Sequence, residues 1–556
     1  MSQATCNQLV AERGGFEPSF TCYSKHGFQA CAISRLSNIP STVIFFWKQI
    51  VGKRCIDSWE PEIHASLVKI LTLRAGSSGL CTPVYPILIC NYYSILGMFL
   101  RFPDEYVKIK YTFPEECMHR KIEESLSIWN KRKNRKPLVL RGARQVGKTY
   151  ALKEFGKQNY SDVAYFNFEK QADLRELFKV NLDVKRILQL LSAIHGRLIH
   201  PEKTLIIFDE IQACGDALTS LKYFSEDAPT YHIAAAGSLL GVKLGQERSF
   251  PVGKVNFLDL HPMTLKEFLL ASDNSSLVES LQHHDFSSKF PEVMHHRLLH
   301  QVRSYLMIGG MPEAVKTWFM TNDFEQVRQV QAEILTSYQN DFQKHTSESD
   351  AIRIQRVWDS IPLQIARENK KFKYSDVKKG GRSAEFEIAL HWLEAAGLVL
   401  KSCHVESGRR PLTAYLDPSH FKLFSLDVGL LAAQLRISAR AFLISDKIFD
   451  EFNGAFTENL VAQELAARGI PLSYWSSEHE AEVDFLIEVA DVIFPLEVKA
   501  GTSRKTKSLR VFEKKFKPAA LYRTTALNFS LDGGIQNIPF YALGSYIDRR
   551  LEIQAK

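Results

Sequence analysis

The sequence predicts an α/β protein in which a parallel sheet carries helices on both faces. Three short apolar runs support this fold class: Leu138–Leu140, Leu205–Phe208 and Ile233–Ala236. Uninterrupted apolar runs of this kind are typical of strands that are buried on both faces of a parallel sheet. A further strand-like run begins at Val163, and helical patterns separate all of these runs. Strands that alternate with helices predict a doubly wound sheet, which we assign to residues 118–270.

A glycine-rich string follows the first apolar run directly and leads into a helix-like segment. It has the form G-x-x-x-x-G-K-T, which is the phosphate-binding loop in its required context of strand, turn and helix N-terminus. Gly142 and Gly147 let backbone N–H groups converge on phosphate oxygens. Lys148 would place its charge on the β- and γ-phosphates, and Thr149 would offer a hydroxyl to Mg²⁺. We expect the whole loop to bind ATP: Gly142, Ala143, Arg144, Gln145, Val146, Gly147, Lys148 and Thr149.

Polar side chains end the second and third apolar runs. Asp209 and Glu210 would lie at the C-terminal edge of the sheet, where open α/β sheets bind their ligands. We expect Asp209 to hold the Mg²⁺ shell and Glu210 to orient and deprotonate the attacking water. Ser238 follows the third run and is placed to touch the γ-phosphate or that water. The Gly-Ser pair is also common turn chemistry, so this assignment has the weaker signal.

Length and composition set broad limits on the rest of the chain. A chain of 556 residues favours three to four domains, and a net charge of +8 permits a nucleic-acid partner without requiring one. Seven of the nine cysteines precede residue 118, and the cysteine-poor remainder fits a reducing cytoplasm. The histidine pairs at 283–284 and 295–296 lack acidic or cysteine partners at ligand spacing, so we expect no metal there.

Residues 1–117 have no sustained helical or strand period. Residues 75–100 carry no charge, and their length alone would allow one membrane span. Pro83, Pro86 and Asn91 argue against that span. We interpret this region as an N-terminal extension outside the natural protein, which we expect to start at Met118 and to have no membrane segment.

The region after the predicted sheet reads as helices over 271–350, followed by a winged-helix-like unit over 351–405. In that unit a basic stretch at 378–382 precedes a helix at 383–396, and a wing strand begins at 398. The second helix of such a unit enters the major groove of DNA, and basic residues at its N-terminus meet phosphates. The alternative is a purely structural helical lid that packs on the first domain.

A second set of charged side chains lies near the C-terminus. Asp484 and the string Glu497-Val498-Lys499 fall on the two strands of a predicted hairpin, so Glu497 and Lys499 point to the same face. Metal-dependent nucleases use this layout: two carboxylates hold Mg²⁺, and the lysine activates water or stabilises the developing phosphorane charge. Glu458, on a preceding helix, could join the metal shell. The same string is also an ordinary edge-strand sequence, and the basic stretch at 504–517 suits either a phosphate backbone or the solvated face of an amphipathic helix.

Taken together, these features resemble a bacterial and archaeal family of AAA-type ATPases. Its C-terminal domain of unknown function looks like a PD-(D/E)XK nuclease. The matching strings are at 140–149, 208–212, 236–241 and 251–255, together with Glu-Val-Asp-Phe-Leu-Ile and Leu-Glu-Val-Lys. The resemblance implies a P-loop NTPase domain, then the helical and winged-helix region, then an α/β restriction-endonuclease-like domain over 406–556. It implies ATP and Mg²⁺ as cofactors but marks no arginine finger, for which Arg248 and Arg144 are the candidates.

The sequence therefore predicts an Mg²⁺-dependent ATPase that couples ATP turnover to DNA binding or cleavage. The alternative is an ATP-dependent regulatory switch that binds a protein partner and whose C-terminal carboxylates only stabilise structure. Asp484, Glu497 and Lys499 distinguish these two hypotheses, because a switch has no need of all three at that spacing. The sequence leaves the oligomeric state and the identity of any nucleic acid open.

Overall fold

The computed structural model describes most of the chain from residue 119 onward. The described ranges are 119–244, 253–272, 274–367, 371–438, 446–477, 481–489, 491–501 and 506–555. They belong to the second of two compact units, residues 102–556. The predictions for residues 1–117, for a span at 75–100 and for Arg248 lie outside the described residues. Within these ranges, no helix is long and apolar enough to cross a membrane.

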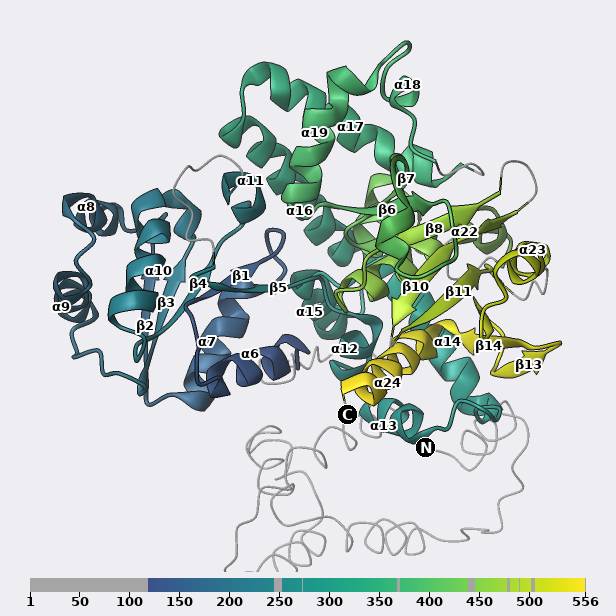
Figure 1. Ribbon diagram of the computed structural model, residues 1–556, viewed down its shortest axis with the longest axis horizontal. Helices are drawn as coiled ribbons and strands as arrows, with labels where there is room; N and C mark the ends of the chain where they lie inside the picture. Colours follow the sequence, from purple (N-terminus) through teal and green to yellow (C-terminus); the bar gives the residue numbers. More distant parts are fainter. Residues whose placement is uncertain are drawn as a thin grey trace, which may run out of the picture. The chain divides into compact units, whose positions relative to one another are not determined.

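The first domain is built on a five-stranded sheet with the order β2-β3-β4-β1-β5, in which every pairing is parallel. The strands are β1 (Leu138–Arg141), β2 (Asp162–Asn167), β3 (Thr204–Asp209), β4 (His232–Ala236) and β5 (Asn256–Asp259) (Figure 1). β1 pairs with β4 and β5, whereas β2, the next strand along the chain, lies at the far edge. This reversal of strand order beside β1 is the point at which open α/β sheets bind ligands.

Alternate residues of the strands pack into two separate cores, which confirms the prediction of helices on both faces. Leu138 and Leu140 belong to one core, with side chains of α6 and α7, whereas Val139 belongs to the other, with side chains of α8, α9 and α10. Successive residues of a strand point to opposite faces, so each core marks one face of the sheet. These helices are α6 (Ile122–Lys131), α7 (Lys148–Asn159), α8 (Ala172–Val180), α9 (Val184–His195) and α10 (Gly215–Asp227), with the short η2 (Ile211–Ala213) before α10.

A helical region follows the sheet. Its helices are α12 (Leu265–Leu270), α13 (Ser275–His283), α14 (Glu292–Ile308), α15 (Pro312–Thr321), α16 (Phe324–His345), α17 (Glu348–Ile365), α18 (Tyr374–Val377) and α19 (Ser383–Ala395), whereas the short α11 (Leu240–Leu244) lies earlier, between β4 and β5. The short α12 contacts α13 and α14. The turn at Gly309-Gly310, which follows α14, lies directly against the segment before α12. A Cβ on Gly310 would be 2.0 Å from the carbonyl oxygen of Met263, so glycine is needed there.

The strand that we expected as a wing is longer and belongs to a larger sheet. β6 (Val399–Val405) pairs antiparallel with β7 (Leu416–Ser425) and parallel with β8 (Ser473–Ser476). It is therefore an interior strand of the sheet β7-β6-β8-β9, with η3 (Leu412–Tyr415) just before β7. Helices α17, α18 and α19 are followed by the hairpin β6–β7, which is the order of elements in a winged helix. Here, however, the hairpin belongs to a sheet of the C-terminal domain.

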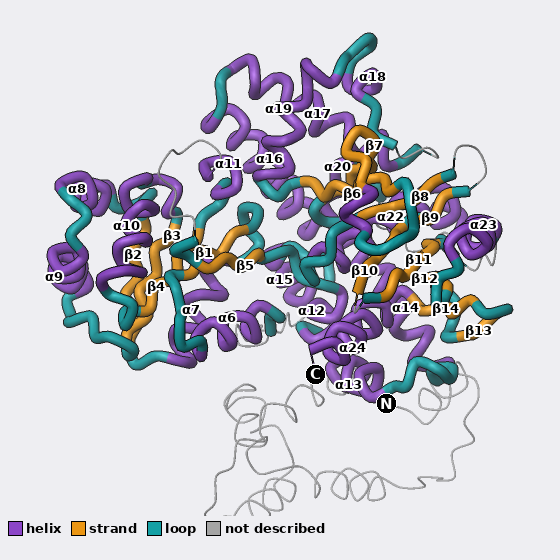
Figure 2. The backbone as a smooth tube through the Cα atoms, in the orientation of Figure 1, coloured by secondary structure: helices purple, strands orange, loops and turns teal. Residues whose placement is uncertain are grey.

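The C-terminal domain contains two mixed sheets, which Figure 2 shows in orange among the helices. The second sheet has the order β10-β11-β12-β14-β13. Only Asp484, at a bend, separates β9 from β10, so the chain passes directly from the first sheet to the second. β10 and β11 form the predicted hairpin. The remaining elements are α20 (Val428–Gln434), α22 (Asp446–Ala466), β9 (Glu482–Val483), β10 (Phe485–Val489), β11 (Val492–Val498), α23 (Lys507–Phe516), β12 (Leu521–Thr525), β13 (Ser530–Asp532), β14 (Ile535–Pro539), η4 (Phe540–Ala542) and α24 (Leu543–Ala555).

Candidate functional site

The glycine-rich loop curls tightly between β1 and α7. Gly142 and Gly147 have φ values of 145° and 94°, and Gln145 has a φ of 65°, in the left-handed region that non-glycine residues rarely adopt. A Cβ on Gly142 would lie 2.2 Å from the carbonyl oxygen of Leu260, so only glycine fits there. Helix α7 begins at Lys148, and the first N–H groups of a helix have no partner within it. The loop and the start of α7 together form the anion-binding geometry that the motif predicts.

Lys148 lies inside this loop and is only 7% exposed. Its Nζ donates to the carbonyl oxygens of Gly142, at 3.0 Å, and Ala143, at 2.6 Å. Burial lowers the pKa of Lys148 to about 8, although the nearby carboxylates of Glu210 and Asp209 act in the opposite direction. The ammonium of Lys148 is therefore held inside the glycine-rich loop by carbonyl oxygens of the loop itself.

The structure brings Asp209 next to Thr149, although the two residues are 60 positions apart. The Thr149 hydroxyl donates to both carboxylate oxygens, at 3.0 and 3.1 Å. Tyr165 also donates to Asp209 Oδ2, at 2.6 Å, as does Asn167, at 3.3 Å. A hydroxyl and a carboxylate are the hard oxygen ligands that Mg²⁺ takes beside substrate phosphates, so these residues fit that ion. No motif in the sequence marks Tyr165 or Asn167, although Asn167 ends β2 directly opposite Asp209 in the sheet register.

The structure also brings Glu210 and Ser238 together. Glu210 has a φ of 51°, and its Oε2 accepts hydrogen bonds from Gln212 Nε2, at 2.5 Å, and from the Ser238 hydroxyl, at 3.3 Å. Gln212 lay within the Asp-Glu string but was not recognised as part of the site. Gly237 makes room for it, because a Cβ there would lie 2.2 Å from Gln212 Oε1. The candidate base is therefore positioned by two donors from separate segments.

Helix α16 contacts the glycine-rich loop at Arg144, and no pattern in the sequence indicates this contact. Arg144 Nη1 donates to Asp341 Oδ1 at 2.7 Å, and the Tyr338 hydroxyl donates to the Arg144 carbonyl oxygen at 2.9 Å. Asp341 is 3% exposed. Arg144, one of the two arginine-finger candidates, is thus bound within the chain by a residue of the helical region.

Arg120 supports the loop from the opposite side. Its buried guanidinium donates to the carbonyl oxygens of Val146, at 3.0 Å, and His261, at 2.6 Å, and to Glu267 Oε1, at 3.1 Å. Glu267 in turn completes a capping box with Thr264 at the start of α12. One arginine therefore ties the phosphate loop to the segment that follows β5.

The charged residues near the C-terminus gather at the kink between the two sheets. Asp484 accepts a hydrogen bond from the backbone N–H of Val498 at 2.8 Å, and Lys499 Nζ lies 2.5 Å from Glu497 Oε1. Glu458 and Glu497 are both buried, and Glu497 Oε2 has no hydrogen-bond partner. Burial raises the pKa of Asp484 above its usual range, and Glu458 and Glu497 raise it further. The expected constellation is therefore brought together, with Asp484 held in an environment that disfavours its charge.

Two members of this cluster were missed. Lys422, from β7, is 1% exposed, and its Nζ lies 2.5 Å from Glu482 Oε1. The charge of Lys422 lowers the pKa of Asp484, as does that of Lys499. Carboxylate oxygens are ligands that a divalent ion accepts, and Glu497 Oε2 has no hydrogen-bond partner, so the chemistry of Asp484 and Glu497 suits such an ion. Among the residues that the structure describes, however, no three acidic, histidine or cysteine side chains lie close enough to form a ready set of ligands.

Comparison with protein families divides the chain into three matched parts. Residues 134–269 match the family described as AAA domain. Residues 299–441 match a domain of unknown function (DUF8612), a span that crosses the boundaries we predicted at 350 and 405, and residues 453–543 match another (DUF4143). No curated protein matches the chain.

Several solved structures are distantly similar. PCH-2 of Caenorhabditis elegans is 13% identical, with a TM-score of 0.24, and the match covers 38% of this chain and 66% of that one. The ORC1 protein of Aeropyrum pernix in complex with DNA is 13% identical, with a TM-score of 0.24, over 61% of this chain and 97% of that one. The RuvB Holliday junction branch migration motor of Thermotoga maritima is 12% identical, with a TM-score of 0.21, over 55% and 94%. Similarity at this level carries no argument about activity. The family match over residues 134–269 and the geometry of the glycine-rich loop together identify an AAA-type P-loop nucleotide-binding domain.

Proposed function

We propose that the chain binds ATP with Mg²⁺ at the phosphate loop and hydrolyses it. The observation that carries this proposal is the convergence of Lys148, the Thr149–Asp209 pair and the Glu210–Ser238 pair at one edge of the sheet. These residues come from the C-terminal ends of β1, β3 and β4, which are neighbours in the sheet. Side chains from three adjacent strands can therefore act on one triphosphate.

Each side chain has a distinct role in this proposal. Lys148 leaves the loop carbonyls and binds the β- and γ-phosphates, while Thr149 and Asp209 would hold Mg²⁺, which neutralises developing phosphate charge. Glu210 takes a proton from the attacking water. Gln212 and Ser238 both engage Glu210 Oε2, so we assign Oε1 to the water. Phosphoryl transfer then depends on positioning and charge stabilisation by groups that the fold already holds in place.

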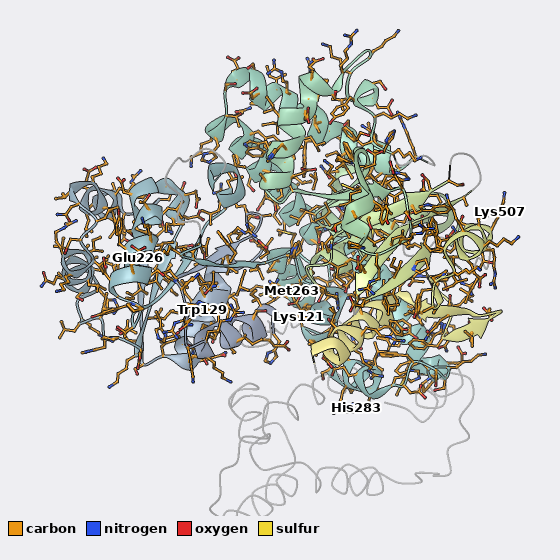
Figure 3. All side chains as sticks on the ribbon, viewed as in Figure 1. Lys121, Trp129, Glu226, Met263, His283 and Lys507 are labelled. Atoms are coloured by element: carbon orange, nitrogen blue, oxygen red, sulfur yellow. The ribbon has the colours of Figure 1, made fainter. Side chains whose placement is uncertain are left out.

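Phosphate release from ATP tests this assignment in the full chain. We expect Glu210→Gln to keep nucleotide binding but lose turnover by about 10²-fold or more, since general-base catalysis contributes roughly 10²–10⁴-fold. Lys148→Ala should lose binding and turnover together. Glu226→Gln is the matched control, because it makes the same chemical change at a partly exposed carboxylate of the same domain (labelled in Figure 3). Wild-type turnover by Glu210→Gln would contradict the proposed role of this residue.

A second candidate activity is phosphodiester cleavage at the C-terminal cluster. Asp484 and Glu497 are both buried, and burial is the main cause that raises the pKa of Asp484. Glu497 is close enough for its charge to raise the pKa of Asp484 further, and Lys499 is paired with Glu497. Helix α23 contacts β9 and β11 beside them. Its exposed lysines are Lys507, Lys514 and Lys515, of which Lys507 is labelled in Figure 3. A basic helix next to buried carboxylates suits a nucleic-acid backbone.

We place DNA contact at α23 rather than at α19, the helix of the winged-helix prediction. Lys378, Lys379 and Arg382 before α19 are exposed, but the exposed face of the helix itself presents Glu387 and Ile388. An acidic side chain on that face would repel phosphates. The structural-lid alternative fits α19 better, because a Cβ on Gly241 of α11 would lie 2.2 Å from the carbonyl oxygen of Ala395.

Supercoiled plasmid separates the nuclease from the regulatory-switch alternative. The full chain would be incubated with plasmid and Mg²⁺ or Mn²⁺, with and without ATP, beside Asp484→Asn and Lys148→Ala. Nicking that Asp484→Asn abolishes would support the nuclease, and loss of ATP dependence in Lys148→Ala would show that the two sites are coupled. Intact plasmid in every condition, with ATP turnover retained, would favour the switch, in which Lys422 and Lys499 simply neutralise the carboxylates.

A further inference from the structure

Helix α16 makes an ion pair with the phosphate loop that the proposed hydrolysis does not use. Arg144 Nη1 lies 2.7 Å from Asp341 Oδ1, and the side chain of Asp341 is 5% exposed, whereas that of Arg144 is 37% exposed. Tyr338, one turn earlier on α16, donates to the carbonyl oxygen of Arg144. The helix thus binds both the side chain and the backbone of a residue within the loop.

Arg144 also lies close to the position that phosphates would take. Burial is the main cause that lowers the pKa of Lys148, and the charge of Arg144 acts in the same direction, so the two cations are near each other. The hydrogen bond from Lys344 is the main cause that lowers the pKa of Glu169, which follows β2, and the charge of Arg144 acts in the same direction. A terminal phosphate between Lys148 and the water held by Glu210 would bring negative charge within reach of this guanidinium. The terminal phosphate would then compete with the Asp341 carboxylate for the guanidinium of Arg144.

We propose that Arg144 exchanges Asp341 for the terminal phosphate of ATP, so that α16 senses which nucleotide the loop holds. ADP lacks that phosphate and leaves the Arg144–Asp341 pair intact. The exchange replaces one ion pair with another and involves no covalent step. The inference rests on the proposed function of the loop, namely ATP binding, and adds to it a residue pair that distinguishes ATP from ADP.

Helix α16 contacts the first domain at one end and the helical region at the other, so the exchange at Arg144 would affect both. Its last turns face the first domain, where Lys344 Nζ lies 2.8 Å from Glu169 Oε1 in a second ion pair. Its first turns face away from the loop: Gln331 Nε2 donates to the carbonyl oxygens of Met307 and Ile308, and Arg328 Nη2 donates to that of Ile437. A buried carboxylate that loses its cation is unfavourable, so release of Arg144 should loosen the end of α16 that holds Asp341.

Equilibrium binding of ATP and ADP tests this inference. Dissociation constants would be measured with Mg²⁺ in the Glu210→Gln background, which prevents turnover, for Asp341→Asn, Arg144→Ala and both together. Without its competitor, Arg144 should favour ATP more strongly, so we expect Asp341→Asn to raise the preference for ATP over ADP by about tenfold, within the usual range of coupling between sites. The substitution should have no effect once Arg144 is removed. Glu333→Gln, an exposed carboxylate on the same helix, is the control.

The outcomes separate the two levels of the proposal. Failure of the Glu210→Gln background chain to bind either nucleotide would overturn ATP binding itself. Binding of both nucleotides with an unchanged preference in Asp341→Asn would overturn the sensor role alone. Hydrogen exchange in the wild-type chain needs no variant to fold: amides of residues 337–345 should exchange faster with a non-hydrolysable ATP analogue than with ADP, and equal rates would contradict the exchange.

Discussion

At the scale of single residues, Lys148 links the structure of the loop to its chemistry most directly. Its ammonium is desolvated, and its pKa is lowered to about 8 from an ordinary value of 10.5. A bound triphosphate would favour the charged amine and raise that pKa again. Binding should therefore take up a proton wherever the amine of the free loop is already neutral, which is above pH 8.

This linkage predicts the sign of a pH effect on ATP affinity. Below about pH 7 the amine is charged before and after binding, so affinity should not change through this group. Above about pH 8 affinity should fall by up to tenfold per pH unit, because binding then includes one proton. Titration calorimetry from pH 6.5 to 9.5 in two buffers would measure both affinity and proton uptake. Lys148→Arg keeps its charge across this range, so any binding it retains should show no such dependence.

A site residue can be predicted from the sequence when the residues next to it in the chain already indicate its position. The loop, Asp209 and Glu210 were predictable because each ends an apolar strand, and strand ends gather at one edge of a parallel sheet. Asp341 and Lys422 were not, because they reach their sites only through long-range packing. Nothing in the sequence around Asp341 distinguishes it from the other acidic residues of a long amphipathic helix.

At the scale of elements, Arg120 shows how a short segment before the sheet stabilises the loop. It satisfies the Val146 and His261 carbonyl oxygens and the buried carboxylate of Glu267, which would otherwise be left without these donors. Removal of one partner from a buried ion pair costs roughly 3–5 kcal/mol. We expect Arg120→Met to lower the free energy of unfolding by about that amount, measured by chemical denaturation.

The neighbouring Lys121 provides the comparison for this prediction. It pairs with Asp548 of α24, but its side chain is 42% exposed, so Lys121→Ala should cost no more than about 1 kcal/mol. Equal losses from the two variants would show that the buried contacts of Arg120 are not what stabilises the loop.

The bounds of a helix can be predicted where its apolar residues repeat at helical spacing. The bounds of a strand are harder to predict, because they depend on which other strands it pairs with. The helix expected at 383–396 is α19 (Ser383–Ala395), because its buried face repeats along the sequence. The sequence predicts only a short wing strand at β6, because the pairing of β6 with both β7 and β8 is set by residues far along the chain. The break at Asp484 between β9 and β10 is likewise a tertiary feature that no local pattern marks.

At the scale of the whole described region, the sheet domain and the C-terminal domain share one hydrophobic core. That core includes Leu138 of β1, Met307 of α14 and Ile547 of α24. Ionic contacts reinforce it, because Asp548 of α24 binds both Lys121 and Arg468, and Arg468 also binds Glu464 of α22. Glu464 accepts a hydrogen bond from the backbone N–H of Leu265 as well.

A shared core predicts that these parts unfold together rather than one by one. Calorimetry should show a single transition for the region from residue 119 onward, and ATP should move all of it to higher temperature. A ligand at 100 times its dissociation constant adds about 2.7 kcal/mol to the free energy of unfolding. Two transitions, of which ATP shifts only the first, would show that the phosphate loop is not coupled to the C-terminal domain.

The central claim is that the glycine-rich loop at residues 142–149 is a site for ATP, and equilibrium titration of the full chain with ATP and Mg²⁺ tests it most directly. We predict one saturable site per chain, which Lys148→Ala abolishes and which the control Glu226→Gln leaves unchanged. Absence of saturable binding, or equal binding by Lys148→Ala, would contradict the claim and remove the basis for the roles proposed for Asp209, Glu210 and Arg144.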